Sequence, residues 1–159
     1  MNPIGIYFAF WEREWQGDYL AYVRKVKRLG FDILELGAGA LPDMTAAERR
    51  AVADAAREEG VRLTYCIGLP PQYDVSSPDE SVRLAGVRYV STLLDCIGEM
   101  GGGILGGIVY ACWPAAEMSI DRKAVMRGKA LLSVRELAKR AEDRGVTYCL
   151  EIVNRFEQC

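Results

Sequence analysis

The sequence predicts an α/β fold built on a parallel sheet. Short apolar runs alternate with longer stretches in which apolar residues recur at helical spacing. The predicted strands begin near residues 4, 31, 61, 104 and 146, so every gap holds a helix and none is short enough for a hairpin. Strands that are joined through helices run parallel, with right-handed crossovers. The chain is therefore predicted to contain about five strands and four helices in strict alternation.

The first two strand–helix units are each closed by a glycine. A buried strand is predicted over residues 4–10, and a helix with apolar positions three residues apart over 18–29. The second strand is predicted over 31–36. The sequence TAAE is a capping box and opens a helix over 45–59. The glycine that follows each helix predicts its C-terminal end.

The remaining units follow the same pattern. A third strand is predicted over 61–67, and the next helix is expected to begin at Ser77, which is followed by a proline and by a glutamate three residues on. A fourth strand over 104–110 is preceded and entered by glycines, which favours close backbone packing over a phosphate-binding loop. A helix over 121–144 and a strand over 146–153 complete the series.

Two architectures fit this alternation: a doubly wound open sheet and a (β/α)₈ barrel. An open sheet is complete with five strands, so the length of 159 residues favours it. Against it, the first strand–helix turn lacks the G-x-G-x-x-G pattern and no helix follows the last predicted strand. Periodicity leaves both architectures open.

Composition excludes several classes of function. The 20 basic and 22 acidic residues give a net charge of −2 without a run of either sign, so neither nucleic acid nor a membrane surface is an expected partner. The absence of histidine excludes Ser-His-Asp and Cys-His catalysis and histidine-ligated zinc. The N-terminus lacks the features of a signal peptide, and the five cysteines show no C-x-x-C spacing. A cytoplasmic protein with buried, reduced thiols is expected.

Two carboxylates lie inside predicted buried strands, where a charge is costly unless it is paired or used. Glu35 and Glu151 both fall toward the carboxyl ends of their strands, the end where α/β folds bind ligands. Either is equally well explained as a structural carboxylate paired with an arginine or a backbone donor. The polar segment 154–157, which begins three residues after Glu151, favours a functional site over a structural role.

Aromatic residues and a cysteine also fall at strand ends. Trp11 and Trp15 follow the first strand and Trp113 follows the fourth, where flat apolar walls suit the faces of a sugar; ordinary packing explains them equally well. Tyr7 and Cys66 are expected near the same mouth, although packing is the more common role of a single cysteine.

Five sets of residues match one family pattern in order along the chain. They are GIYFAFW with the following EW, LGFD with LE, CIGL, YD with SPD, and EIVNRFEQ. Together they resemble the ketose 3-epimerase family, which includes D-tagatose and D-psicose 3-epimerases. The resemblance implies a (β/α)₈ barrel of the xylose-isomerase-like kind and resolves the choice of architecture.

The resemblance also implies a chemistry. Members bind one divalent metal, Mn, Co or Mg, through two glutamates, an aspartate and a histidine, and hard oxygen ligands suit these metals. The two glutamates exchange a proton at carbon 3 of a free ketohexose through an enediolate, which interconverts tagatose with sorbose and fructose with psicose.

The family roles carry over to particular residues. Glu151 matches a metal ligand that is also one of the two acid/base groups, and Glu157 matches a glutamate that binds the substrate near its reacting oxygens. The resemblance gives a substrate-binding role to Tyr7, Trp15, Cys66 and Trp113, and a supporting or structural role to Glu35 and Arg155.

The chain departs from the family in one respect. The aspartate, the histidine and the second glutamate come from later strands in the family, whereas this chain ends at Cys159, just past the fifth strand. Residues 1–159 are thus expected to form the N-terminal part of one barrel domain that binds metal weakly, is inactive alone and self-associates through its open edges. The alternatives are a non-catalytic sugar-binding or assembly half-barrel, or a hydroxypyruvate-isomerase-like enzyme.

Overall fold

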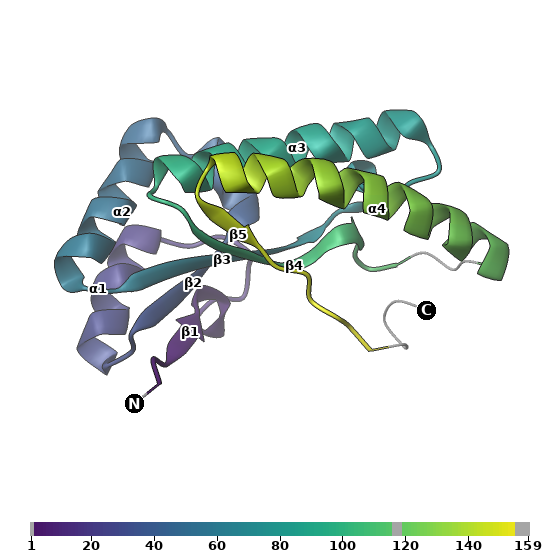
Figure 1. The fold of residues 1–159 in the computed structure, drawn as a ribbon. Helices are drawn as coiled ribbons and strands as arrows, with labels where there is room; N and C mark the ends of the chain where they lie inside the picture. The colour runs from purple at the N-terminus through teal and green to yellow at the C-terminus, as the bar shows by residue number, and fades with distance from the viewer. Residues whose placement is uncertain (1, 116–118, 155–159) are drawn as a thin grey trace.

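The computed structural model describes residues 2–115 and 119–154, which form one parallel sheet with helices packed on it (Figure 1). The strands lie side by side in chain order, with each pair parallel. They are β1 (Gly5–Tyr7), β2 (Ile33–Gly37), β3 (Arg62–Leu69), β4 (Gly103–Cys112) and β5 (Val146–Tyr148). The helices are α1 (Tyr19–Leu29), α2 (Ala46–Glu59), α3 (Glu80–Glu99) and α4 (Ile120–Asp143), and the short 3₁₀ helices are η1 (Phe8–Phe10), η2 (Ala38–Asp43) and η3 (Pro71–Tyr73).

The strand order excludes the doubly wound sheet. That architecture reverses its strand order at a switch point, which places helices on both faces. Here the order β1 to β5 never reverses, so right-handed crossovers place every helix on the same face. This is the arrangement of the first half of a (β/α)₈ barrel.

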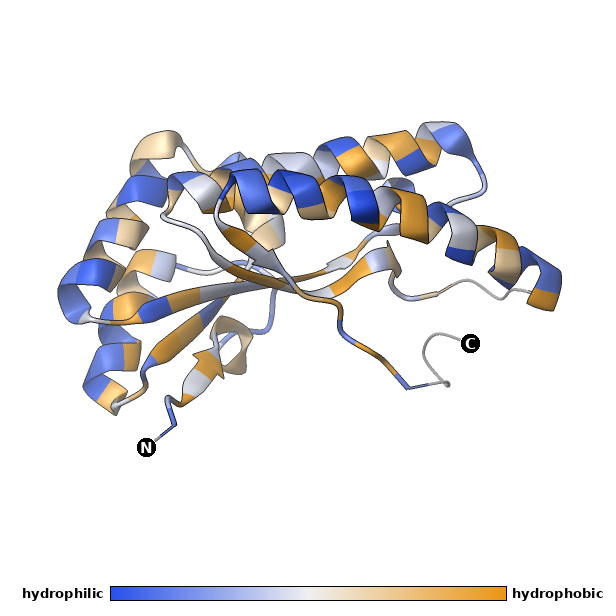
Figure 2. Ribbon diagram, viewed as in Figure 1, coloured by the Kyte–Doolittle hydropathy of each residue, from blue (hydrophilic) through white to orange (hydrophobic). Residues whose placement is uncertain are grey.

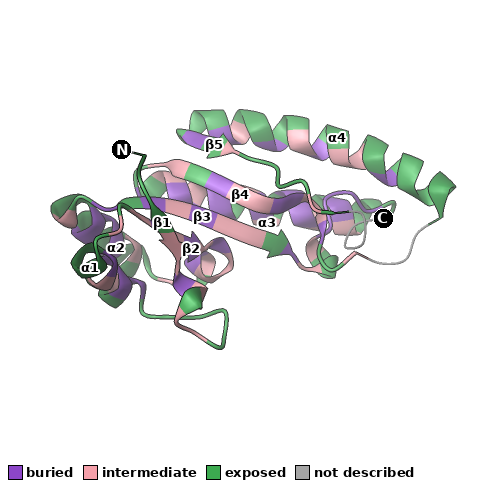
Figure 3. Cartoon of the chain, turned by 90° about the horizontal axis from the view of Figure 1, so that it is seen from below, coloured by how far each residue is buried: buried purple, intermediate pink, exposed green. Residues whose placement is uncertain are grey.

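The hydrophobic core lies between the sheet and the helices (Figure 2). Alternate strand residues point to this side, and Leu36, Tyr65 and Leu105 pack there against α3 residues such as Leu94. The residues between them, including Glu35 and Thr64, point to the opposite, inner face, onto which Figure 3 looks. No helix covers this face in the described residues, so its side chains are only partly buried.

Two strands are shorter than the sequence predicts. β1 ends at Tyr7 because residues 8–10 turn into η1, which buries Phe8 completely against Tyr19, with 5.2 Å between the ring centroids. The ladder of β5 ends at Tyr148, yet the backbone follows β4 further: Glu151 N donates to Gly107 O at 3.0 Å.

The predicted start of the third helix is also wrong by two residues. Asp79, not Ser77, is the N-cap of α3, because its carboxylate accepts from both the backbone N–H (2.8 Å) and the hydroxyl (2.7 Å) of Ser81. Ser77 lies in the loop before α3, where its hydroxyl accepts a hydrogen bond from the backbone N–H of Asp79 at 3.2 Å. The capping box at Thr45 is confirmed.

The cysteines of the described residues are not joined in disulfides, and they lie in different surroundings. Cys96 and Cys112 are buried and Cys66 is partly buried, but the expectation of burial is wrong for Cys149, which lies exposed beyond β5 on the uncovered inner face. Cys159 lies outside the described residues. Across those residues no helix is long and apolar enough to cross a membrane.

Candidate active site

A cavity of about 1330 Å³ lies where the strands end, on the inner side of the sheet. Its wall comes from β1, β3 and β4 and from the loops that follow the strands, as expected for the carboxyl ends of a parallel barrel. Five of the predicted site residues line it: Tyr7, Trp15, Cys66, Trp113 and Glu151. Glu157 and Arg155 lie outside the described residues.

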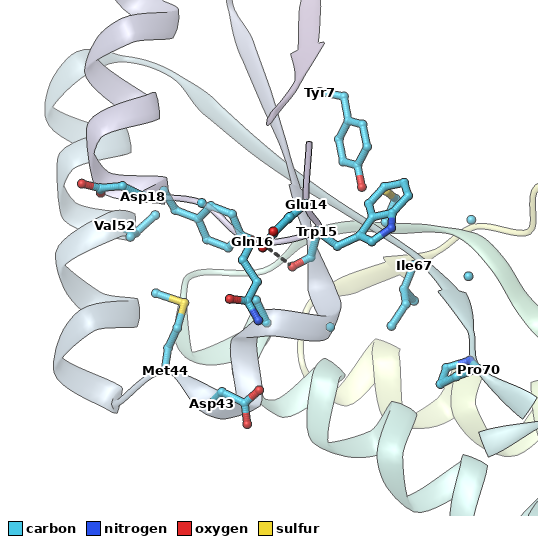
Figure 4. Close-up of a pocket in the computed structure, with 18 of the residues that line it drawn as sticks. Tyr7, Glu14, Trp15, Gln16, Asp18, Asp43, Met44, Val52, Ile67 and Pro70 are labelled. Carbon is cyan, nitrogen blue, oxygen red and sulfur yellow. Dashed lines mark hydrogen bonds between the residues drawn. The ribbon is translucent and has the colours of Figure 1, made fainter. Parts of the chain in front are cut away.

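Aromatic side chains form one wall of the cavity. The rings of Tyr7 and Trp15 lie together, with 6.4 Å between their centroids, and Trp15 is 71% exposed (Figure 4). Trp113 is fixed by its backbone N–H, which donates to Leu69 O at 2.8 Å. Its ring lies over Gly68, where a Cβ atom would come within 3.5 Å of it. Exposed flat rings of this kind suit the apolar faces of a sugar.

Trp11 does not belong to this wall, although it also follows the first strand. Its ring stacks on Tyr22 of α1 at 5.5 Å, and the Lys25 ammonium lies 4.1 Å from its centroid. For Trp11, ordinary packing is the correct reading.

A layer of polar groups lies at the base of the cavity. In the sheet register Glu35 stands between Tyr7 and Thr64, and its carboxylate accepts from the Thr64 hydroxyl at 3.4 Å. The pKa of the Cys66 thiol is raised to about 11, chiefly by burial; the Tyr7 hydroxyl opposes this shift and the nearby Glu35 carboxylate adds to it. Burial and Cys66 also raise the pKa of Tyr7. Both groups are therefore neutral at pH 7. Glu35 pairs with Tyr7 in the sheet register but does not itself line the cavity.

Glu151 brings an exposed carboxylate to the cavity from beyond β5. Its backbone N–H is bonded to Gly107 O on β4, which fixes where the side chain begins. Its negative charge raises the pKa of Tyr110, after the larger effect of burial. It also contributes, as the smallest cause, to the raised pKa of Cys66. A carboxylate with solvent access beside a partly apolar cavity is suited to proton transfer.

The far end of the cavity is lined by four residues that were not predicted from the sequence, three of them polar. Gln16 comes from the loop before α1, Asp43 and Met44 from the end of η2, and Glu48 from the first turn of α2 (Figure 4). Glu48 is held by its capping bonds to Thr45. Their position in the sequence could have indicated a place in the site, since these segments follow the first two strands, at the end of the sheet where ligands bind.

The described residues do not by themselves form a metal site. They contain no group of three or more His, Cys, Asp or Glu side chains placed to hold an ion. Glu151 offers one hard oxygen ligand, whereas Mn or Mg needs several. The residues described here therefore do not fit a complete metal centre.

Comparison with known proteins identifies relatives of this arrangement. Residues 23–159 match the family described as Xylose isomerase-like TIM barrel. A D-psicose 3-epimerase from Ruminiclostridium cellulolyticum is 39% identical over 154 residues, which cover 96% of this chain and 52% of that protein. A D-psicose 3-epimerase from Agrobacterium fabrum is 32% identical over 153 residues, covering 96% and 53%. The chain thus spans about half the length of these curated relatives.

Solved structures agree with this fold. The D-psicose 3-epimerase from Clostridium cellulolyticum H10, crystallised with D-tagatose, superposes with a TM-score of 0.93 at 38% identity and covers 98% of this chain and 54% of its own. A D-psicose 3-epimerase solved in the presence of D-fructose gives a TM-score of 0.92 at 32% identity, with 98% and 54% covered. The chain belongs to the xylose isomerase-like TIM barrel family, among the ketose 3-epimerases, and matches the N-terminal half of the barrel.

Proposed function

We propose that residues 1–159 are the N-terminal part of one barrel domain that epimerises free ketohexoses at carbon 3 in a metal-dependent reaction. The substrates are the pairs tagatose/sorbose and fructose/psicose. In this proposal Glu151 is one of the two acid/base groups and one metal ligand, while Tyr7, Trp15, Cys66 and Trp113 bind the sugar. Glu157 hydrogen-bonds the substrate, and Glu35 and Arg155 support the site.

One observation carries the proposal: the acid/base candidate and the four sugar-binding candidates, which come from four separate parts of the chain, all line the same cavity. The aromatic wall suits the apolar face of a sugar, and the neutral Tyr7 and Cys66 groups offer hydrogen bonds to its hydroxyls. Glu151 can exchange a proton on one face of the substrate only. A reaction that needs a base on each face therefore requires a second group from outside the described residues.

The chain alone is accordingly expected to be inactive. Titration of the 159-residue chain with Mn²⁺ should show weak binding, since its described part contains no group of three or more His, Cys, Asp or Glu side chains placed to hold the ion. Tight binding of one Mn²⁺ by the isolated chain would contradict the incomplete site.

The function is tested in a single polypeptide that joins this chain to the remainder of the Ruminiclostridium cellulolyticum enzyme beyond the matched segment. We expect Mn²⁺-dependent conversion of D-fructose to D-psicose, and a loss of about 10²–10⁴-fold in kcat for Glu151→Gln, because general acid–base catalysis contributes that much. Glu58→Gln, an exposed change on α2 away from the cavity, is the matched control. A fusion that folds but converts no ketohexose, or a Glu151→Gln variant as active as its parent, would overturn the proposal.

The intact aromatic wall also supports a second candidate, a non-catalytic sugar-binding module. Calorimetric titration of the chain with D-fructose and D-tagatose distinguishes the two, because the module binds sugar without metal.

A further inference from the structure

A β-bulge in β4 lies between two sides of the candidate site. Consecutive residues of β3 pair with Ile108 and Cys112, so residues 109–111 have no partner in the β3 register. Trp113 of the aromatic wall follows this bulge, and the neighbouring segment beyond β5 carries Glu151. Bulges re-aim the side chains near them, so the shape of this one affects how the wall and the acid/base candidate are placed.

Backbone bonds join β4 to the segment that carries Glu151. Glu151 N donates to Gly107 O at 3.0 Å, and the bond before it lies two residues earlier on each strand. In a regular parallel ladder donors and acceptors both advance by two residues, so the next bond would join Val153 N to Val109 O. Val109 is the first residue of the bulge, and two tyrosine hydroxyls bind at this point of the ladder.

These hydroxyls come from the two facing segments. The Tyr148 hydroxyl, from β5, donates to Val109 O at 2.7 Å. The Tyr110 hydroxyl, from the bulge, bonds to the backbone of Val153. Each segment thus holds the backbone of the other through one tyrosine, and Glu151 lies in the sequence between the two points of attachment.

The surroundings of Tyr148 favour a fixed hydrogen bond. Its side chain lies in register with Leu105, on the helix side of the sheet, and packs against the hydrophobic core. Burial raises the pKa of Tyr148, so the hydroxyl keeps its proton and acts as a donor at neutral pH. Val109 is completely buried, so water does not compete for its carbonyl. Loss of the hydroxyl would leave that carbonyl without this donor and free the bulge to shift.

We propose that Tyr148 is a positioning residue, which sets the place of Glu151 relative to Trp113 by fixing the bulge against the segment beyond β5. The inference rests on the proposed function of Glu151 and Trp113. Tyr148 is not among the residues that line the cavity, so it acts through the bulge and not by contact with substrate. The effect is expected to be large, because a misplacement of about 1 Å can cost about 100-fold in rate.

Tyr65 provides a matched control within the same row of the sheet. It pairs with Leu105 from the β3 side, as Tyr148 does from the β5 side. It is also a buried tyrosine, but its hydroxyl bonds to the sulfur of Met100 at 3.8 Å, near the start of β4 and away from the bulge. Tyr65→Phe therefore removes a buried hydroxyl without releasing the bulge.

The first test follows Trp113 in the 159-residue chain and does not depend on activity. Trp11→Phe and Trp15→Phe leave Trp113 as the only tryptophan. In this background Tyr148→Phe should raise the acrylamide quenching of Trp113 fluorescence, by up to about twofold because the residue is already 43% exposed. Tyr65→Phe should leave the quenching unchanged. Equal quenching in Tyr148→Phe and its parent would overturn the proposal.

The second test measures kinetics in the single-chain fusion with Mn²⁺ and D-fructose. Tyr148→Phe should lower kcat at least about tenfold, with a smaller change in KM, because the acid/base group is displaced while most of the sugar contacts remain. Tyr65→Phe should stay within about twofold of the parent in both constants. Equal losses of kcat in the two variants would show a general effect of a lost hydroxyl and refute the positioning role.

Tyr110→Phe is the second disruptive variant, for the case in which circular dichroism shows that Tyr148→Phe fails to fold. Tyr110 is only partly buried, and its loss releases the other attachment of the bulge, so it should raise the quenching and lower kcat in the same way. A parent fusion that converts no D-fructose would count against the proposed function alone. The quenching measurement would then decide whether Tyr148 fixes the bulge.

Discussion

The Cys66 thiol keeps its proton to unusually high pH, because it is partly buried beside Tyr7 and Glu35 at the base of the cavity. Its pKa of about 11, against an ordinary 9.0, disfavours the thiolate in the folded state. This contribution to stability is complete below pH 9 and is lost as the pH rises toward 11. Cys66 is therefore suited to hydrogen bonding and not to nucleophilic attack.

Alkylation of the native chain tests this assignment. At pH 8 a rise of two units in pKa lowers the thiolate fraction about 100-fold, so iodoacetamide should modify Cys66 about 100-fold more slowly than an ordinary thiol. The exposed Cys149 is the internal control and should react first, as followed by peptide mass spectrometry. Equal rates at the two positions would contradict a buried, protonated Cys66.

For single residues, the sequence predicts which side chains are candidates for the site better than it predicts what surrounds them. Glu151 and the aromatic residues at strand ends are visible because parallel strands present their carboxyl ends to one place. Asp43 and Met44 were not predicted because they lie at the end of the 3₁₀ helix η2 and directly after it, in a segment whose path no periodicity reveals. Trp15 lines the cavity and Trp11 does not, because the loop after β1 turns so that Trp11 stacks on Tyr22 of α1. The sequence alone does not show the direction of this turn.

Among the elements, β4 depends most on glycine. Gly107 has φ of +103° and packs against β3, where an added Cβ would meet Ile67 O at 2.4 Å. This close approach, and not a phosphate loop, explains Gly107. The C-terminal ends of α1 and α2 were predictable because their glycine caps are local, whereas the end of β1 depends on the burial of Phe8 by residues elsewhere in the chain.

Two glycine substitutions separate close packing from backbone strain. Gly101 has φ of +102°, almost equal to that of Gly107, but no atom lies within 4 Å of its added Cβ. Gly101→Ala is expected to cost about 1 kcal/mol from the left-handed backbone alone, and Gly107→Ala about 3 kcal/mol or more in the free energy of unfolding, because strand β3 must move. Urea denaturation of both variants measures the difference. Equal losses would show that contact with Ile67 is unimportant.

For the whole molecule, the uncovered inner face is the main physical fact. Polar Glu35 and Thr64 share it with apolar side chains such as Ile104, which is 41% exposed. Both edge strands, β1 and β5, also present unpaired backbone within the described sheet. The parallel direction of the strands was predictable from their alternation with helices, but their order in the sheet was not, because the same alternation fits an open doubly wound sheet and a barrel.

Without a partner the chain should self-associate in a concentration-dependent way. Exposed apolar groups and open edges favour association, although the charges on α1 and α4 oppose an ordered head-to-tail dimer. Light scattering over a dilution series, with dye binding to exposed apolar surface, measures the effect. A monomer that melts cooperatively at every concentration would contradict it.

The pairing of β3 with β4 shifts register near the cavity, where Gly68 pairs with Ile108 and Leu69 with Cys112. Residues 109–111 of β4 therefore form a β-bulge, with no partner in the β3 register, shortly before Trp113. Each strand residue spans about 3.3 Å, so insertion or deletion there moves the tryptophan wall by about the length of two carbon–carbon bonds while the ladder below stays intact. A change in the length of this one bulge would in this way resize the proposed sugar pocket, with no substitution at any residue that lines it.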